Sequence, residues 1–312
     1  MSETPRTAVR RAGHIDDSPG TLLLENTVKE VFEGSTGLAH TANFIDGMFR
    51  FAVEDADLTE RDRRLYTQIG GRLGPTFAKI DAWTAPLDSG RLIRLVLSRT
   101  GGGVYYISLR PGETQFGVAR DGDQVERGDR QMAQISDRVR ELYSLGPENL
   151  GGYSTFVPAL PDVPEPAPVR FEAPGADALL VDLSRRRVSP LDLHYVSGHR
   201  GADHLFTTDV LPDDGLGTYF RRVSVAEHRK RYEEIFLSAR QLVRSLTYQL
   251  KPVLRGPLTR VVMDVEQGAL YYRCLPDGLA LFGVTLRQSK VWDADRRLEE
   301  IIDEYLGSGA AV

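Results

Sequence analysis

Hydrophobic positions in the second half of the chain first follow a helical period and then a strand period. From Val225 to Val253, apolar residues recur at three- and four-residue intervals, which predicts one long amphipathic helix. From Arg260 onward, apolar and polar residues alternate, which predicts a strand with one buried face. Turn sequences at Gln267-Gly268 and Pro276-Asp277-Gly278 divide the rest into two more strands. The pattern therefore indicates a helix followed by a three-stranded antiparallel meander.

The same pattern occurs earlier in the chain at a constant offset of 166 residues. Of the 49 aligned pairs from Arg91/Pro257 to Val139/Tyr305, 16 are identical, and no gap is needed. Self-similarity at a fixed period indicates an internal duplication. Each copy ends in a segment with helical spacing of its apolar residues, at 132–142 and 298–305. We therefore expect an α+β fold of tandem duplicated modules, each a helix, a three-stranded antiparallel meander and a helix, related by a pseudo-twofold axis.

Changes in composition mark the expected boundaries. Residues 1–19 have no hydrophobic periodicity and are expected to form a disordered arm. The first module is expected at 20–150 and the second at 176–312. Residues 151–175 between them are rich in proline and are expected to form an extended linker.

Local signals predict where several elements begin or break. Thr59 is expected to cap a helix, and Pro75 should kink or restart that helix. Asp129 and Asp293 are expected to cap the closing helices of the two modules. The apolar run at 176–182 is expected to be a strand.

The overall composition mainly excludes certain classes of protein and certain partners. A net charge of −5 gives no general attraction to nucleic acid or to an anionic membrane. The single cysteine, Cys274, excludes an internal disulfide framework. The longest apolar runs are too short to span a membrane, and the first residues lack the apolar core of a signal peptide. We expect a cytoplasmic protein with no membrane partner and no cofactor.

Residues that recur on the strands of both copies are the candidate partner-binding residues. Adjacent residues on a strand face opposite ways, so one tyrosine of each recurring pair should lie under the helices and the other should face outward. An outward aromatic row would form a binding surface, although tyrosine is also a good strand former. The recurring arginines could bind a partner's acidic group or pair with carboxylates of their own module. The candidates are Arg94, Tyr105, Tyr106, Arg260, Tyr271 and Tyr272.

Three histidines lie close together at 194–204, in a stretch (184–217) that reads as a loop. Imidazole is a zinc ligand, so His194, His199 and His204 are the candidate ligands of a metal-dependent hydrolase. Their spacing of five residues fits no helical face and no known ligand motif. A solvated polar loop explains them more simply, and we assign no metal.

Two clusters of basic residues, at 185–187 and 221–231, are the candidates for a nucleic-acid site. They are not interleaved with aromatic residues and are followed at once by Glu233 and Glu234, which argues against nucleic-acid binding. The chain has no nucleotide-binding glycine motif and no nucleophile motif, and no pair of acid, base or nucleophile groups recurs in both copies. The sequence therefore favours a protein that is not an enzyme.

The order of elements in each half resembles that of several small α+β families: roadblock and longin-type modules, secretion-chaperone-like folds, and immunity proteins that neutralise bacterial toxins. The resemblance rests on element order and on no motif. It implies binding of another protein through a sheet face or edge. We predict a non-enzymatic, bacterial-type cytoplasmic adaptor or interaction protein, with an immunity protein and a metal-dependent hydrolase as alternatives, and with a homodimer allowed. The stretches 70–75 and 194–204 differ most between the copies and are where function is expected.

Overall fold

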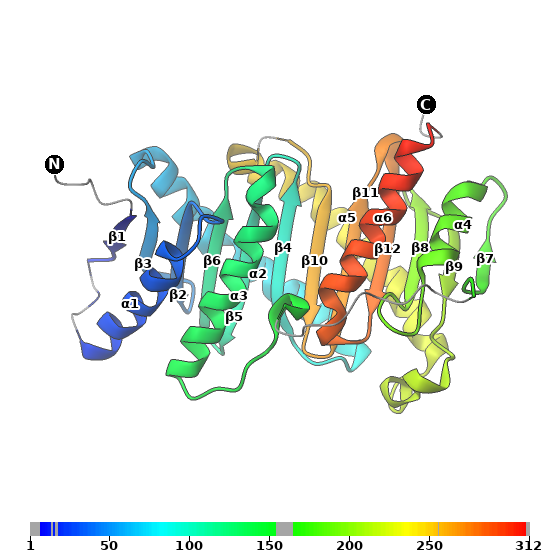
Figure 1. Ribbon diagram of the computed structural model, residues 1–312, viewed down its shortest axis with the longest axis horizontal. Coiled ribbons are helices and arrows are strands. Elements are labelled where there is room, and N and C mark those ends of the chain that lie inside the picture. Colours follow the sequence, from blue (N-terminus) through cyan, green and yellow to red (C-terminus); the bar gives the residue numbers. More distant parts are fainter. Residues whose placement is uncertain (1–6, 14, 16–17, 154–164, 255, 310–312) are drawn as a thin grey trace. The chain divides into compact units, whose positions relative to one another are not determined.

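A computed structural model describes residues 7–13, 15, 18–153, 165–254 and 256–309 (Figure 1). The chain divides into two compact units. Unit 1 comprises Met1–Asp81, Leu92–Asn149 and Ser245–Leu258, and unit 2 comprises Ala82–Arg91, Leu150–Arg244 and Thr259–Val312. Each unit is therefore built from segments that are not contiguous in the sequence.

Six strands of unit 1 pair in the order β1-β3-β2-β6-β5-β4, and each pairing is antiparallel. Most side chains of the central strands are buried on both faces. A sheet of this kind must be covered by helices on both sides. The strands are β1 (Thr7–Arg11), β2 (His40–Ile45), β3 (Met48–Asp55), β4 (Leu92–Arg99), β5 (Gly102–Arg110) and β6 (Glu113–Ala119).

Helices cover both faces of this sheet. In Figure 1, α1 (Pro19–Glu33) and α3 (Val125–Leu142) lie on the near face, and α2 (Glu60–Thr84) lies behind. Helix α3 approaches the sheet closely because β6 carries a glycine at its centre: a Cβ on Gly117 would overlap the side chain of Met132. Behind the sheet, Phe77 of α2 packs on Tyr106 with ring centroids 5.2 Å apart.

Unit 2 contains the antiparallel order β7-β9-β8-β12-β11-β10. Its helices α4 (Ala178–Arg187) and α6 (Val291–Gly307) pack on one face, and α5 (Val225–Leu254) lies on the other (Figure 1). Leu298 of α6 closes over Gly283, where an added Cβ would lie 2.5 Å from Leu298 Cδ1. The strands are β7 (Val169–Glu172), β8 (Tyr195–Arg200), β9 (Asp203–Asp209), β10 (Arg260–Val265), β11 (Gly268–Cys274) and β12 (Leu279–Thr285).

Helices and strands follow the same order twice along the chain, apart from short 3-10 helices. The order is strand, helix, two strands, helix, three strands, helix. The order of the paired strands within each unit is also the same when β1 to β6 are read against β7 to β12. The protein is thus mixed α+β with antiparallel strands.

The meanders and their flanking helices agree with the hydrophobic pattern. The predicted helix at 225–253 is α5, the predicted meander strands are β4–β6 and β10–β12, and the closing helices are α3 and α6. Thr59 caps α2 as expected: its hydroxyl accepts a hydrogen bond from the Asp62 amide at 3.1 Å. The sequence reasoning missed three further strands in each half.

The expected arm and linker are both wrong where the structure describes them. Thr7–Arg11 form β1, which pairs along its whole length with β3. Val169–Glu172 form β7, which pairs with β9. Residues 1–6, 14, 16–17 and 154–164 lie outside the described residues. Edge strands of four or five residues are too short for a period of two to be recognised.

The region after the linker also differs from expectation. The predicted strand at 176–182 is instead the start of α4, capped by Asp177, which accepts from the amides of Leu179 and Leu180 at 3.0 and 3.1 Å. A short apolar run does not distinguish a strand from a buried helix. The predicted loop at 184–217 contains β8 and β9, whose polar residues lie largely buried inside the unit.

The predicted caps of the two closing helices are wrong. Asp129 and Asp293 lie inside α3 and α6, which begin at Val125 and Val291. Helix α2 continues past Pro75 to Thr84.

Candidate functional site

The recurring arginines of the meander form ion pairs within their own units. Buried Arg94 pairs with Asp129 of α3. In unit 2, Arg260 donates to Asp295 Oδ2 from Nε at 2.9 Å and from Nη2 at 2.6 Å, and Arg273 donates to Oδ1 at 2.5 Å. Burial would raise the pKa of Asp295, but the two guanidinium groups hold it below its usual value. These ion pairs join a helix to the sheet. They correspond to the second role considered from the sequence, in which the arginines pair with carboxylates of their own module.

The first tyrosine of each pair ties the sheet to the start of the closing helix. The Tyr105 hydroxyl donates to the carbonyl of Val125 at 2.5 Å, and the Tyr271 hydroxyl donates to the carbonyl of Val291 at 2.7 Å. Both rings are fully buried. Each bond satisfies a polar group that would otherwise be costly to bury.

The second tyrosine of each pair is also buried, so the expected outward aromatic row is wrong. Tyr106 is 3% exposed and lies under Phe77 of α2. Tyr272 is 5% exposed and stacks on Phe236 of α5, with ring centroids 5.5 Å apart. The sequence reasoning assigned helices to one face of the sheet only, whereas α2 and α5 cover the other face.

A buried carboxylate cluster in unit 1 was not predicted. Glu54 of β3 accepts a hydrogen bond from His40 Nδ1 at 2.9 Å and lies 3.6 and 3.5 Å from the Nε atoms of Arg10 and Arg63. Burial would raise the pKa of Glu54, but the histidine and the two guanidinium groups lower it. Burial lowers the pKa of His40, so the ring is neutral. The cluster joins the outer strand β1 to β3 and α2.

Unit 2 has a similar cluster around Asp209 of β9. Both oxygens of this fully buried carboxylate accept from Arg229 of α5, each at 2.8 Å, and Arg170 of β7 lies 3.5 Å away. The arginine therefore binds in the bidentate geometry that is strongest for a carboxylate. As in unit 1, one arginine comes from the outermost strand and one from the helix on the far face.

The three candidate metal ligands do not converge on one point. His194 accepts from the Leu286 amide through Nδ1 at 3.0 Å and donates from Nε2 to the Pro190 carbonyl at 3.3 Å. His199 and His204 face each other across β8 and β9 with stacked rings 4.9 Å apart. Burial lowers the pKa of His194 and of His199 to about 3. Among the described residues, no group of three or more His, Cys, Asp or Glu side chains could hold a metal ion.

The two histidines of the β8–β9 hairpin belong to a column of stacked rings. Phe171 of β7 stacks on His204 at 4.6 Å, and His199 stacks on Phe236 of α5 at 3.5 Å. The column packs the outermost strand onto the helix beneath it. The expectation of a solvated loop in this stretch is therefore wrong, because its histidine rings are packed against other rings.

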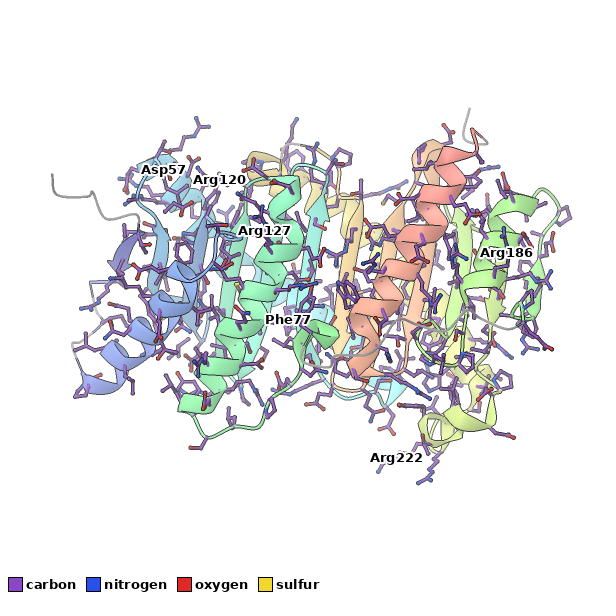
Figure 2. The ribbon with its side chains drawn as sticks, in the orientation of Figure 1. Asp57, Phe77, Arg120, Arg127, Arg186 and Arg222 are labelled. Carbon is purple, nitrogen blue, oxygen red and sulfur yellow. The ribbon has the colours of Figure 1, made fainter. Side chains whose placement is uncertain are left out.

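Members of both basic clusters form ion pairs within the chain. Arg186 pairs with Asp182 on α4 at 3.0 Å, and Arg222 pairs with Asp88 at 3.3 Å; both arginines are labelled in Figure 2. Burial raises the pKa of the Cys274 thiol to about 11, so this side chain is an inert thiol at neutral pH.

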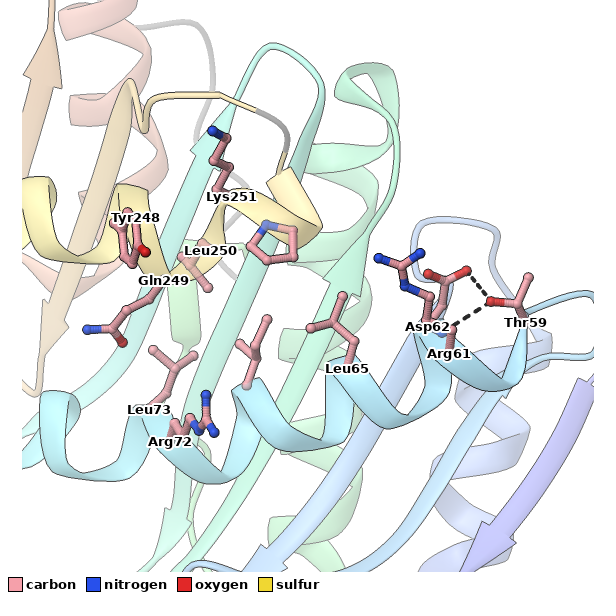
Figure 3. Close-up of a pocket in the computed structure, with 12 residues that line it drawn as sticks. Thr59, Arg61, Asp62, Leu65, Arg72, Leu73, Tyr248, Gln249, Leu250 and Lys251 are labelled. Atoms are coloured by element: carbon pink, nitrogen blue, oxygen red, sulfur yellow. Dashed lines mark hydrogen bonds between the residues drawn. The ribbon is translucent and has the colours of Figure 1, made fainter.

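An open groove in unit 1 is the best candidate for a functional site. It lies between the first half of α2 and the last turns of α5, in the segment Ser245–Leu258 that belongs to unit 1 (Figure 3). Its volume is about 1060 Å³. The floor is apolar, because Ile69, Leu73 and Leu250 line it and are buried, and Leu65 is half-buried. In Figure 3, Leu65 and Leu73 point from α2 toward the end of α5.

The rim of the groove is cationic. Arg61, Arg72 and Lys251 line it and are exposed, and none of their three side chains forms a hydrogen bond or ion pair within the described part of the chain. Asp62 is the acidic residue among its lining side chains, and its carboxylate accepts from the Thr59 hydroxyl at 2.8 Å. The local charge is therefore opposite in sign to the net charge of −5.

An exposed aromatic ring and a second hollow adjoin the groove. Tyr248 of α5 lines the groove and is 83% exposed, the highest exposure among the large hydrophobic side chains that the structure describes. A hollow of about 550 Å³ shares Arg61, Leu65 and Pro252 with the groove and continues along α2 past Arg64. Together they form an extended surface depression and not an enclosed pocket.

Sequence reasoning pointed to part of this site but not to the groove. The stretch 70–75 was expected to matter, and Arg72 and Leu73 of that stretch line the groove. The glycines there have a packing reason: a Cβ on Gly70 would lie 2.7 Å from the Phe44 ring, and one on Gly74 would lie 3.2 Å from the Tyr106 hydroxyl. The residues 248–252 gave no signal, because a pattern read along one helix does not reveal which segment lies beside it.

Comparison with models of known protein families gives no match, and comparison with curated proteins gives none either. Of the helices that the structure describes, none combines the length and apolar character needed to cross a membrane.

Proposed function

We propose that the protein is a non-enzymatic interaction protein that binds another protein through the groove of unit 1. The observation that carries this proposal is the apolar floor beneath an exposed tyrosine, Tyr248, and a rim of unpaired cations. Tyrosine and arginine beside an apolar depression are the residues that most often dominate protein interfaces. The site replaces the outer sheet faces proposed from the sequence.

The interaction could serve an adaptor or, as in immunity proteins, the neutralisation of a toxin, and the identity of the partner decides between them. Both activities need an accessible binding surface, and the groove supplies one. A cytoplasmic location, expected from the sequence, remains part of this proposal.

Photo-crosslinking from the groove tests the proposal. A photoreactive amino acid at Tyr248 or Gln249, both groove-lining, should crosslink the same protein in cells that express the full chain. The same group at Met48, which is 59% exposed and does not line the groove, is the matched control. Equal crosslinking from Met48, or no crosslinked protein from either groove position, would remove the groove as the binding surface.

We also propose that the two halves of the chain arose by duplication. The 166-residue offset relates Arg94 and Asp129 to Arg260 and Asp295, which form the same kind of ion pair. It also relates Arg63 to Arg229, each of which holds a buried carboxylate. The pseudo-twofold relation between the halves stays a prediction.

A further inference from the structure

We infer that the partner inserts a short amphipathic helix into the groove of unit 1, with large apolar side chains on one face and acidic side chains on the other. This inference rests on the proposed function and specifies the chemistry of the partner. The groove is formed by two helices, so it offers side chains and no unpaired strand edge. Such a surface suits a helix laid in a groove and not the addition of a strand.

Charge complementarity argues for an acidic partner. Arg61 and Arg72 of α2 and Lys251 of α5 surround the apolar floor, and none of them forms an ion pair with a described acidic group. Arg64, which lines the adjoining hollow, is instead paired with Glu60 at 2.9 Å. Carboxylates on the partner's helix would form ion pairs with these three cations and would speed association at low salt.

In unit 2, a segment of the chain itself packs against the corresponding helix. The 3-10 helix η4 (Asp214–Phe220) lies between β9 and α5. Its Leu216 is fully buried, and its Phe220 packs edge-on against His228 of α5 with ring centroids 5.0 Å apart. At the offset of 166, His228 corresponds to Asp62 of α2, which lines the groove.

Unit 1 has no such segment between the matching elements. β3 ends at Asp55 and α2 begins at Glu60, so only residues 56–59 connect them. The surface of α2 that corresponds to the covered part of α5 is therefore open to a partner. The occupant in unit 2 brings leucine and aromatic side chains together with Asp213 and Asp214, which is the composition inferred for the partner.

A designed peptide tests the inference on the full chain. The probe is a fluorescein-labelled helical peptide with leucine and phenylalanine on one face and glutamate on the other, and its binding is followed by fluorescence anisotropy. We expect the peptide to bind, and its affinity to fall as NaCl is raised from about 50 to about 300 mM, because salt screens exposed charges. A peptide with lysine at every glutamate position should bind at least about tenfold more weakly.

Charge reversals locate the binding site. Arg61→Glu and Lys251→Glu should each weaken the acidic peptide by about tenfold and strengthen the lysine peptide. Arg138→Glu, on the exposed surface of α3 and outside the groove, should leave both affinities unchanged. Circular dichroism and thermal unfolding confirm that each variant is folded.

Three outcomes would overturn the inference. They are equal binding of the acidic and lysine peptides, acidic-peptide binding that is unaffected by both groove reversals, and no binding of the acidic peptide at low salt. If any of these occurs while Tyr248 still crosslinks a protein, the proposed function survives and the chemistry inferred for the partner is wrong. If Tyr248 crosslinks nothing as well, both are wrong.

Discussion

At the scale of single residues, buried ion pairs connect helices to strands. Arg94 is 1% exposed, and its partner Asp129 belongs to α3, which packs on the neighbouring strands β5 and β6. Both residues were visible in the sequence as positions repeated at the same offset. Their pairing could not be derived, because alternation along a strand shows a polar position but not whether water or another element covers it. The same ambiguity produced the wrong expectation for Tyr106 and Tyr272.

Neutralising one member of a buried pair should be costly. In Asp129→Asn, the buried Arg94 guanidinium would lose the negative charge of Asp129. We expect the free energy of unfolding in urea to fall by about 3–5 kcal/mol. The control is Glu126→Gln on the same helix, which removes an exposed pair with Arg130 and should cost at most about 0.5 kcal/mol. Equal effects of the two variants would show that the buried pair contributes nothing special.

The glycine of β8 should be required for packing. A Cβ on Gly198 would overlap the ring of Phe206, which is fully buried. We expect Gly198→Ala to lower the free energy of unfolding by about 1–3 kcal/mol, because the aromatic ring has no room to move aside. Gly217→Ala is the control, since nothing lies within 4 Å of its added Cβ. A neutral Gly198→Ala would mean that the ring can shift at no cost.

At the scale of elements, the outermost strands depend on ionic contacts more than on apolar burial. In β7, Val169 is half-buried and the other three residues are exposed, and the residues of β1 are likewise half-buried or exposed. Arg10 holds β1 to Glu54, and Arg170 holds β7 to Asp209. The meander strands have longer apolar patterns and were predicted correctly. The edge strands bury few apolar residues, so they carry no clear pattern in the sequence and depend on ion pairs in the fold.

Loss of the Glu54 charge should loosen β1 before the rest of unit 1. In Glu54→Gln, Arg10 and Arg63 lose the carboxylate that holds them. Hydrogen exchange of the amides of Thr7–Arg11 should speed up by about tenfold or more, whereas exchange in β5 should change little. Uniform acceleration throughout unit 1, or no change in β1, would contradict a local role for this carboxylate.

At the scale of the whole molecule, buried neutral histidines link stability to pH. The pKa of His194 and of His199 is about 3 in the folded chain. An exposed histidine in the unfolded chain titrates near about 6.5. Because the folded pKa lies below the unfolded one, the unfolded chain binds more protons between these values. Stability is then complete above pH of about 6.5 and declines as the pH falls.

The slope of this decline can be measured. Each such histidine should lower the free energy of unfolding by about 1.4 kcal/mol per pH unit between pH of about 6 and about 5. This window lies above the range in which carboxylates such as Asp295 begin to protonate. His199→Gln should make the slope shallower by one proton, whatever its effect on stability at neutral pH. An unchanged slope in that variant would show that His199 is not the group that takes up the proton.

The fold could be predicted from the sequence in those parts where a long periodic pattern exists, such as α5 and β10–β12. The fold could not be predicted at the groove, where the function is proposed. The groove joins residues 59–73 to residues 248–252, and neither stretch carries a motif. The binding role proposed for it rests on the absence of ion-pair partners for the side chains of Arg61, Arg72 and Lys251 within the described residues, which only a folded structure reveals.

The discontinuity of unit 1 has a consequence for synthesis on the ribosome. One wall of the groove is made early, with residues 59–73, but the other consists of residues 248–252 near the end of the chain. A nascent chain therefore has no complete groove until residues 248–252 have been translated. An expressed fragment that stops near residue 150 would lack the second wall. Its failure to bind a partner would reflect that missing wall, even though the first wall is present in the fragment.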